Sequence, residues 1–108
     1  MPNSLKNQST QSPERIQNGD IVKHFKRETT DNTDPNAYLY KVIDINARNT
    51  DNYERVVIYE ALYDNNNIVH HGDIFVRKYD EFMSETDHVK YPEIKQHYRF
   101  EKYEKQSN

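Results

Sequence analysis

The most apolar stretch of the chain is Arg55–Tyr63, R-V-V-I-Y-E-A-L-Y, and a second one, I-F-V-R, follows at Ile74–Arg77. Both are rich in β-branched and aromatic residues, and Asn and Asp clusters border them, a pattern typical of two adjacent strands in a hairpin. On the first strand, Val57, Tyr59 and Tyr63 fall on one face because side chains alternate along an extended chain. We therefore predict that the core is built around this hairpin.

Three further segments have the pattern of strands. The turn signal Gly19-Asp20 precedes Ile21–Lys26, in which apolar and polar side chains alternate. Tyr38–Asn46 carries apolar groups on both faces, which predicts a central strand that is covered on both sides over part of its length. Tyr98–Tyr103 alternates cleanly and predicts a last strand.

The segments between the strands predict turns and one helical turn. Asp64–Asn67 consists of Asp and Asn, which tolerate the left-handed conformation of a tight turn, and Arg27–Asn36 has the composition of a loop. Tyr79–Met83 has the spacing of one helical turn that closes over an open end of the sheet. The predicted fold is mainly β: a small SH3-like, partly open barrel of about five strands with one short helical turn. The likeness to SH3 barrels is an analogy at the level of the fold.

Length and composition indicate one small domain. The 108 residues are 33% hydrophobic and 31% charged, so the core is small. Residues 1–18 are polar and predict a disordered N-terminal tail, 19–103 the domain, and 104–108 a frayed C-terminus. No apolar run is long enough for a signal peptide or a membrane span, so we expect a cytoplasmic protein without membrane contact. The many Asn, Lys, Ile and Tyr residues indicate an AT-rich genome, as in a low-GC bacterium or one of its phages.

The chain lacks the residues on which several classes of chemistry depend. It has no Cys, which excludes disulfides and thiolate chemistry, and its two Gly cannot build a phosphate-cradling loop. His70-His71-Gly72-Asp73 is the one cluster that resembles metal ligands, but adjacent residues of a strand point to opposite sides. We therefore expect a non-catalytic protein with no metal and no cofactor. The formal net charge of −3 gives no global attraction to nucleic acid.

Several short blocks of the chain resemble a bacterial family, domain of unknown function sixteen-fifty-three. Its members show H-Y/F-K, then Y-x-V, then V-V-Y-x-A-L-Y, then an aliphatic residue with W-V-R-P and a later Phe. The matching residues here are His24-Phe25-Lys26, Tyr40-Lys41-Val42, Val57–Tyr63, and Ile74–Arg77 with Phe82, and the tail is matched more loosely by Tyr91-Pro92 and Tyr98-Arg99-Phe100.

The resemblance covers roughly Gly19 to Lys102, with two departures from the pattern. Phe75 stands where the family usually has Trp, and Lys78 where it usually has Pro. The family implies a compact domain with these boundaries and no established activity. It directs attention to a recurring Tyr and a recurring Arg.

The candidate ligand-binding residues surround Arg77. We expect Tyr63 to face Arg77 across the hairpin, and a guanidinium beside aromatic rings can stack on a base or bind phosphate. A simpler interpretation is that Arg77 pairs with Glu60 or Asp80 and packs on a Tyr at the surface. We expect Lys26, His24 and Arg48 to add positive charge if the strand ends converge. The full set of predicted ligand-binding residues is Arg77, Tyr63, Tyr59, Phe75, Lys26, His24 and Arg48.

The predicted function is a small binding module that recognises a nucleotide-like small molecule, for example by sequestering a signal nucleotide, or a peptide or protein. The first alternative is a domain that binds single-stranded nucleic acid through the basic segment Lys23–Arg27 and exposed Tyr side chains. The second alternative is a structural homodimer formed through an edge of the sheet.

Overall fold

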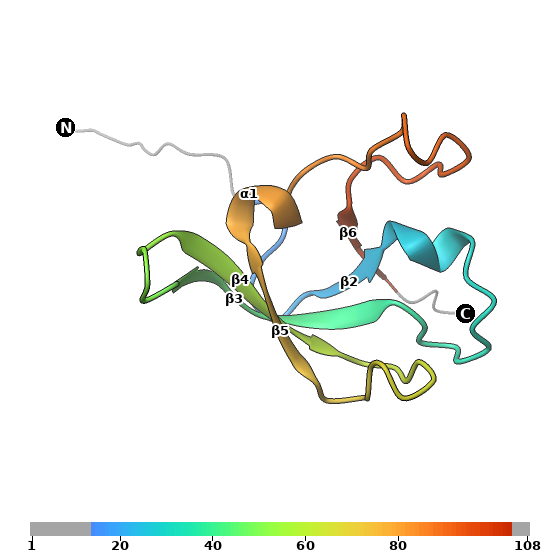
Figure 1. Ribbon diagram of the computed structural model, residues 1–108, viewed down its shortest axis with the longest axis horizontal. Coiled ribbons are helices and arrows are strands. Elements are labelled where there is room, and N and C mark those ends of the chain that lie inside the picture. The colour runs from blue at the N-terminus through green and yellow to red at the C-terminus, as the bar shows by residue number, and fades with distance from the viewer. Residues whose placement is uncertain (1–13, 105–108) are drawn as a thin grey trace.

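Five antiparallel strands form one sheet in a computed structural model that describes residues 14–104. The strand order is β5-β4-β3-β2-β6, so β5 and β6 are the two edges and the sheet does not close (Figure 1). The elements in chain order are β2 (Ile21–His24), the 3-10 helix η1 (Phe25–Glu28), β3 (Leu39–Arg48), β4 (Arg55–Ala61), β5 (Ile74–Lys78), α1 (Tyr79–Phe82) and β6 (Phe100–Lys102). The prediction of a small, mainly β, partly open barrel with one short helical turn is confirmed.

The hairpin of β4 and β5 has the predicted place at the centre of the packing. In its register Tyr59 lies opposite Phe75, and Val57 lies opposite Arg77. The turn that starts the connection contains two Asn residues, Asn66 and Asn67, at φ 44° and 67°, as predicted for an Asx-rich turn. Of the two faces of β4, the one that carries Val57, Tyr59, Ala61 and Tyr63 is buried, and Glu60 lies on the other.

The strand β3 is central, and its alternation is broken by irregular pairing. Its register with β4 shifts between Val42 and Asp44 and again between Asp44 and Ala47, as in a β-bulge. The shift turns Ile45 into the core, whereas Ile43 stays 41% exposed, although regular alternation would place the two side chains on one face. The irregular backbone remains hydrogen-bonded, because the Asn18 side chain accepts from the Ile45 N–H at 2.8 Å and Arg55 Nε donates to the Ile45 carbonyl at 2.9 Å.

Three strands are shorter than predicted, and one of them is β4, which ends at Ala61 and not at Tyr63. The strand predicted over Ile21–Lys26 ends at His24, because Phe25 turns into the core and begins η1. The ring of His24 caps this helix, since its Nδ1 accepts from the Lys26 N–H at 3.1 Å. The last strand, β6, is also shorter than the alternating segment that predicted it.

The core is mainly aromatic and is covered at one end by α1. Phe82 from α1 stacks on Phe100 from β6, with ring centroids 4.1 Å apart and an interplanar angle of 8°. Tyr59 packs against both rings, with centroids 5.2 Å and 5.5 Å away. The chain therefore closes an open end of its sheet with a ring from the helical turn, as the spacing of that segment predicted.

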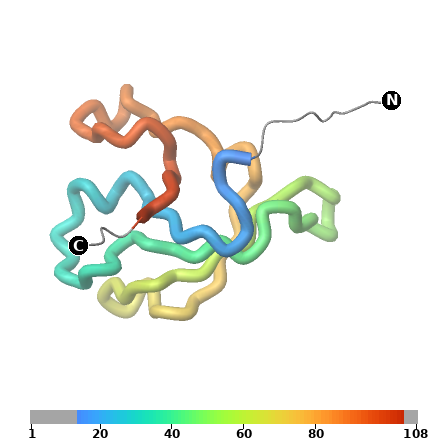
Figure 2. Tube along the Cα trace, turned by 180° about the vertical axis from the view of Figure 1, so that it is seen from behind, coloured from blue at the N-terminus to red at the C-terminus, as the bar shows by residue number. Residues whose placement is uncertain are grey.

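The described residues before β2 pack on the domain. Ile16 is fully buried in the core, and Arg15 donates to the Phe100 carbonyl at 2.7 Å and to the Met83 carbonyl at 3.1 Å. Figure 2 shows this first segment, in blue, next to the segment that contains α1. Residues 14–18, which were predicted to belong to the disordered tail, are thus part of the folded domain. The rest of the predicted tail, 1–13, and the predicted frayed end, 105–108, lie outside the described residues.

None of the helices within residues 14–104 has the length and apolar character needed to span a membrane.

Candidate functional site

A cleft of about 290 Å³ opens on the inner side of the sheet, between its two edges. We call it the aromatic cleft, because seven rings line it together with two cations and three further residues. The rings are His24, Tyr38, Tyr40, Tyr59, Tyr63, Phe75 and Phe100; the cations are Lys26 and Arg77; the others are Asn65, Ile68 and Val69.

Arg77 is held in this cleft from the edge strand β5. Its Nε donates to the Tyr59 hydroxyl at 3.2 Å, and its Nη1 pairs with Glu81 at 3.1 Å. Its guanidinium carbon lies 5.9 Å from the centroid of Phe100, which belongs to the opposite edge strand. The hydrogen-bonded neighbour of Arg77 is therefore Tyr59, not Tyr63, and its carboxylate is Glu81, neither Glu60 nor Asp80 as the simpler interpretation expected.

Arg77 keeps its positive charge despite its position. Partial burial lowers the pKa of Arg77, but the Tyr59 hydroxyl and the Glu81 carboxylate raise it more, so that the pKa lies above its ordinary value. The Glu81 side chain is 52% exposed, and an exposed ion pair contributes only about 0.2–1 kcal/mol. A doubly charged phosphate can therefore compete with Glu81 for the guanidinium.

His24 is a neutral hydrogen-bonding group and not a cation. The residue is 8% exposed and packs against Phe25, with centroids 4.3 Å apart, and edge-on against Phe100 at 5.0 Å. Burial, followed by the charges of Arg77 and Lys26, lowers the pKa of His24 to about 3. The prediction that His24 adds positive charge is wrong.

The rings of the cleft differ in how much of their faces they offer. Tyr40 and Tyr63 are buried and share a hydroxyl–hydroxyl hydrogen bond of 2.9 Å, and burial raises the pKa of both. Tyr59 is buried as well, at 5% exposure. Tyr38 and Phe75 are only partly buried and pack on the core from the rim. These two rings, and not Tyr59 or Tyr63, are positioned to stack on a ligand.

Tyr38 has an unusual backbone. Its φ is 61°, in the left-handed region that a bulky residue seldom adopts, and strain of this kind is concentrated at ligand sites. Its carbonyl accepts from the His24 N–H at 3.0 Å, and its ring lies 5.2 Å from that of Tyr63. The strained turn therefore fixes the ring at the cleft.

A second, smaller hollow of about 230 Å³ adjoins the cleft. We call it the cationic hollow, because four of its residues carry positive charge and one carries negative charge. It shares His24, Lys26 and Arg77 with the aromatic cleft and adds Phe25, Asp87, Lys90, Tyr91 and Arg99.

Six of the seven predicted ligand-binding residues line the aromatic cleft, and Arg48 does not. Arg48 ends β3 and lines a shallow hollow together with Val56 and Ile58. Its Nη1 donates to the Tyr53 carbonyl at 3.3 Å within its own hairpin. The positively charged residues predicted to converge therefore do so only at the end of the sheet that carries Lys26 and Arg77, and Arg48 lies apart from them.

Several residues that line these sites were missed from the sequence, and four of them matter most for a ligand: Tyr38, Phe100, Lys90 and Arg99. Tyr38 precedes its strand in a segment that gave no sign of a left-handed turn. Phe100 and Arg99 were assigned only to a strand, while Lys90 lies in a region without periodicity that the fold brings back beside β2. Only knowledge of which strands pair across long distances in the sequence could have placed these residues at the two sites.

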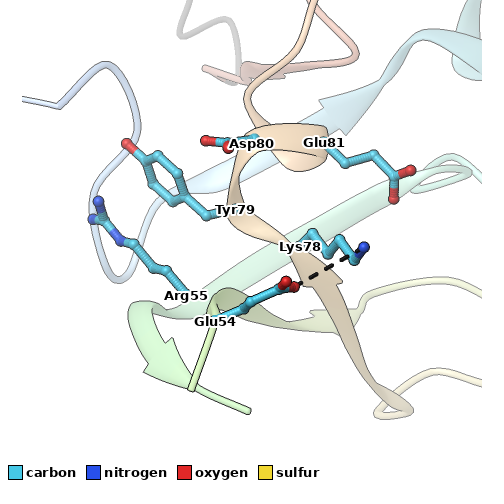
Figure 3. Close-up of a pocket in the computed structure, with 6 residues that line it drawn as sticks. All are labelled: Glu54, Arg55, Lys78, Tyr79, Asp80 and Glu81. Atoms are coloured by element: carbon cyan, nitrogen blue, oxygen red, sulfur yellow. Dashed lines mark ion pairs between the residues drawn. The ribbon is translucent and has the colours of Figure 1, made fainter. Parts of the chain in front are cut away.

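The largest hollow, of about 610 Å³, lies beside α1 and does not have the features of a ligand site. Figure 3 shows its lining of charged side chains and one ring: the Arg55 guanidinium covers the Tyr79 ring at 3.6 Å, and Lys78 approaches Glu54 at 4.0 Å. Its charges are of both signs, and its one ring is already stacked with a guanidinium. It lacks the group of aromatic rings that lines the aromatic cleft.

The His70-His71 region is held by hydrogen bonds of a turn. The His70 N–H donates to Asp73 at 2.9 Å, and the His71 N–H donates to Asp64 at 3.2 Å. Within residues 14–104, no group of three or more His, Asp and Glu side chains is arranged to hold a metal ion.

The fold and the cleft define a small, mainly β domain with an aromatic and cationic site at the open side of its sheet. The chain belongs to the family described as "Protein of unknown function (DUF1653)", whose model matches residues 20–102. The resemblance inferred from the sequence is thereby confirmed. No curated protein and no solved structure gives a match to the chain.

Proposed function

We propose that this protein is a non-catalytic binding module for a nucleotide-like small molecule. The observation that carries the proposal is the meeting of partly exposed rings and a fixed guanidinium in one cleft. A planar base stacks on aromatic faces, and a guanidinium binds phosphate through paired N–H groups. In this arrangement Tyr38 and Phe75 receive the base, while Arg77 and Lys26 meet the phosphate.

The size of the cleft supports a small molecule over a protein or peptide. Its volume of about 290 Å³ is close to the lower end of the range for small-molecule pockets, roughly 300–1,000 Å³. A protein partner needs a far broader surface, of roughly 800 Å² on each side. A peptide or protein remains the alternative outcome of the experiment below.

The arrangement of the Tyr residues also favours a small molecule over single-stranded nucleic acid. All nine Tyr residues lie within the described part of the chain, and only Tyr53, at 74% exposure, is freely exposed. In the basic segment Lys23–Arg27, Phe25 is buried and Arg27 donates to the Ala37 carbonyl at 2.7 Å. Extended strands of nucleic acid need a row of exposed rings and free cations.

The composition of the chain indicates the kind of organism in which this role would be found. Richness in Asn, Lys, Ile and Tyr fits a low-GC bacterium or one of its phages. There, a small cytoplasmic protein that sequesters a signal nucleotide would need the features of this cleft and no catalytic group.

Native mass spectrometry of the protein purified from a bacterial host tests the proposal. We expect a retained mass that matches a nucleotide, or uptake of one from a nucleotide panel, and loss of that mass in Arg77→Ala. Arg48→Ala is the matched control, because it removes the same charge outside the cleft. Thermal unfolding of both variants verifies that they are folded.

A bare protein that takes up no nucleotide from the panel would overturn the proposal in favour of a peptide, protein or single-strand partner. Equal loss of ligand in Arg77→Ala and Arg48→Ala would also count against it, because the effect would then reflect net charge and not the cleft.

A structural homodimer is a second candidate, supported by the edge strand β5. Its outward residues Ile74 and Val76 are 58% and 64% exposed, next to an edge whose backbone groups have no neighbouring strand within the described sheet. Such edges pair readily with a second copy unless charge prevents it. Sedimentation decides between the candidates: a dimer that dissociates in Val76→Lys supports it, and a monomer at all concentrations rejects it.

A further inference from the structure

We propose that the cationic hollow binds a further phosphoryl group, so that the preferred ligand is a nucleoside di- or triphosphate and not a monophosphate. This inference rests on the proposed function, because it extends the same ligand beyond the aromatic cleft.

The two cavities are adjacent and share part of their lining. His24, Lys26 and Arg77 line both of them, so a ligand whose first phosphate lies at Arg77 has the cationic hollow directly beside it. Neither cavity alone, at about 290 Å³ and about 230 Å³, reaches the range typical of small-molecule sites, but together they fall within it.

The far wall of the hollow supplies cations that the cleft does not use. Arg99 is anchored through its Nε, which lies 3.3 Å from the Ser84 hydroxyl, so the anchoring bond leaves its terminal N–H groups for a ligand. Lys90 adds a second charge from the loop before Tyr91. The hollow contains four cations and one carboxylate, Asp87.

The carboxylate of Asp87 has a local role that reduces its opposition to an anion. Its Oδ1 accepts from the backbone N–H groups of Val89 and Lys90, each at 3.1 Å. These bonds hold the turn that presents Lys90. The hollow as a whole is therefore strongly positive, and a pyrophosphate group is of matching charge and size.

His24 provides a polar contact at the junction of the two cavities. Because its Nδ1 accepts the Lys26 N–H, the neutral ring carries its proton on Nε2. Thr86 Oγ1 is the one buried side-chain N or O atom without a hydrogen-bond partner within residues 14–104, so Nε2 of His24 is open to solvent where the two cavities meet. A phosphate oxygen at this junction can accept from Nε2, and the surrounding Arg77, Lys26 and Arg99 favour an anion there.

Isothermal titration calorimetry of the whole protein tests the inference with adenosine and guanosine, their mono-, di- and triphosphates, and inorganic phosphate and pyrophosphate. We expect the diphosphate to bind about tenfold or more tightly than the monophosphate. The double variant Lys90→Ala/Arg99→Ala should remove that preference and leave monophosphate affinity unchanged. Lys41→Ala/Arg48→Ala, which removes one Lys and one Arg away from both cavities, is the matched control.

The outcomes separate this inference from the proposed function. Equal affinity for mono- and diphosphates, or a preference that survives Lys90→Ala/Arg99→Ala, overturns the inference and leaves the nucleotide module in place. Failure of every nucleotide and nucleoside to bind overturns both. A loss of preference that also occurs in Lys41→Ala/Arg48→Ala overturns the inference, because net charge then explains it. Arg99→Lys keeps the positive charge at this position. If Arg99→Lys retains the preference for the diphosphate and the double variant loses it, misfolding is excluded as the cause.

Discussion

Tyr38 combines a costly backbone with a partly exposed ring. A non-glycine residue at a positive φ, here 61°, costs on the order of 1–3 kcal/mol unless its surroundings enforce it. Its neighbours His24 and Tyr63 hold the ring at the cleft, with centroids 5.9 Å and 5.2 Å away. Under the proposed function, contact with the ligand explains a ring that is kept at the cleft at such a cost.

This explanation makes Tyr38→Asn a discriminating variant. Asn accepts the left-handed conformation, so we expect the free energy of unfolding to change by no more than about 1 kcal/mol. Loss of the stacking ring should weaken ligand binding about tenfold or more. Tyr53→Asn is the control, because Tyr53 has the same φ of 61° but is 74% exposed in a different hairpin. Equal losses of affinity in both variants would contradict a role for Tyr38.

His24 predicts a specific dependence of stability on pH. Its pKa is about 3 in the folded protein against an ordinary 6.5, so between these values only the unfolded chain takes up a proton. Stability should therefore fall as the pH falls from 6.5 toward 3, by up to about 1.4 kcal/mol per pH unit from this residue.

Urea unfolding between pH 6.5 and 4.5 measures this dependence. His24→Gln, which retains a hydrogen-bonding side chain, should show a flatter loss of stability with acid than the unchanged protein. His71→Gln, at an exposed position, should not. Parallel curves for the protein and His24→Gln would show that His24 is not held neutral by the fold.

At the level of the elements, the N-terminal segment 14–18 is a structural part of the domain. It precedes the region matched by the family model, which begins at residue 20, yet Ile16 is fully buried. Asn18 satisfies the irregular backbone of β3, and Arg15 covers the ring of Tyr98 at 3.8 Å. The segment joins the central strand to the region around β6.

We expect Ile16→Ala to lower the free energy of unfolding by about 2–5 kcal/mol, the usual range for truncating a buried Ile. Chemical denaturation measures it. Ile68→Ala is the matched control, because Ile68 is 76% exposed and its truncation should cost less than about 0.5 kcal/mol. Similar small effects at both positions would show that the segment is not part of the cooperative core.

The strands of the central hairpin could be predicted from sequence, because burial on one face imposes alternation over Arg55–Ala61. The end of β2 could not, since the turn of Phe25 into the core depends on Tyr91, whose ring lies 4.9 Å away. The inward rotation of Ile45 depends on a shift of register that alternation alone cannot reveal. Local pattern determines the face of a residue only while the pairing stays regular.

The same limit explains what could be predicted of the site. Arg77 and Phe75 lie on a strand whose hairpin partner was predicted, so their place among the rings of that partner followed, although the ring expected beside Arg77 was Tyr63 and not Tyr59. Arg48 was included for its charge alone, and its distance from the cleft depends on the register of β3. Lys90 reaches the hollow through the fold of an aperiodic segment, and Arg99 through the pairing of β6 with β2.

At the scale of the whole molecule, ligand binding should raise the stability of the entire domain. The cleft takes residues from all five strands or their immediate flanks, so the ligand binds only the folded chain. A ligand at a hundred times its dissociation constant adds about 2.7 kcal/mol, which corresponds to a rise in Tm of about 10–20 °C for a domain of this size.

Differential scanning fluorimetry with the nucleotides of the calorimetric panel measures this shift. The rise should disappear in Arg77→Ala and persist in Arg48→Ala. A shift that persists in Arg77→Ala would place the ligand elsewhere on the protein.

The contact between Arg77 on β5 and Phe100 on β6 joins the two free edges of the open sheet, with 5.9 Å between guanidinium carbon and ring centroid. A molecule held between these strands acts as a cross-link and completes the barrel that the backbone leaves open. Amide hydrogen exchange should then slow at both edges together on binding, although no hydrogen bond connects them. Under the proposed function, we expect occupancy of the cleft and closure of the barrel to be one event.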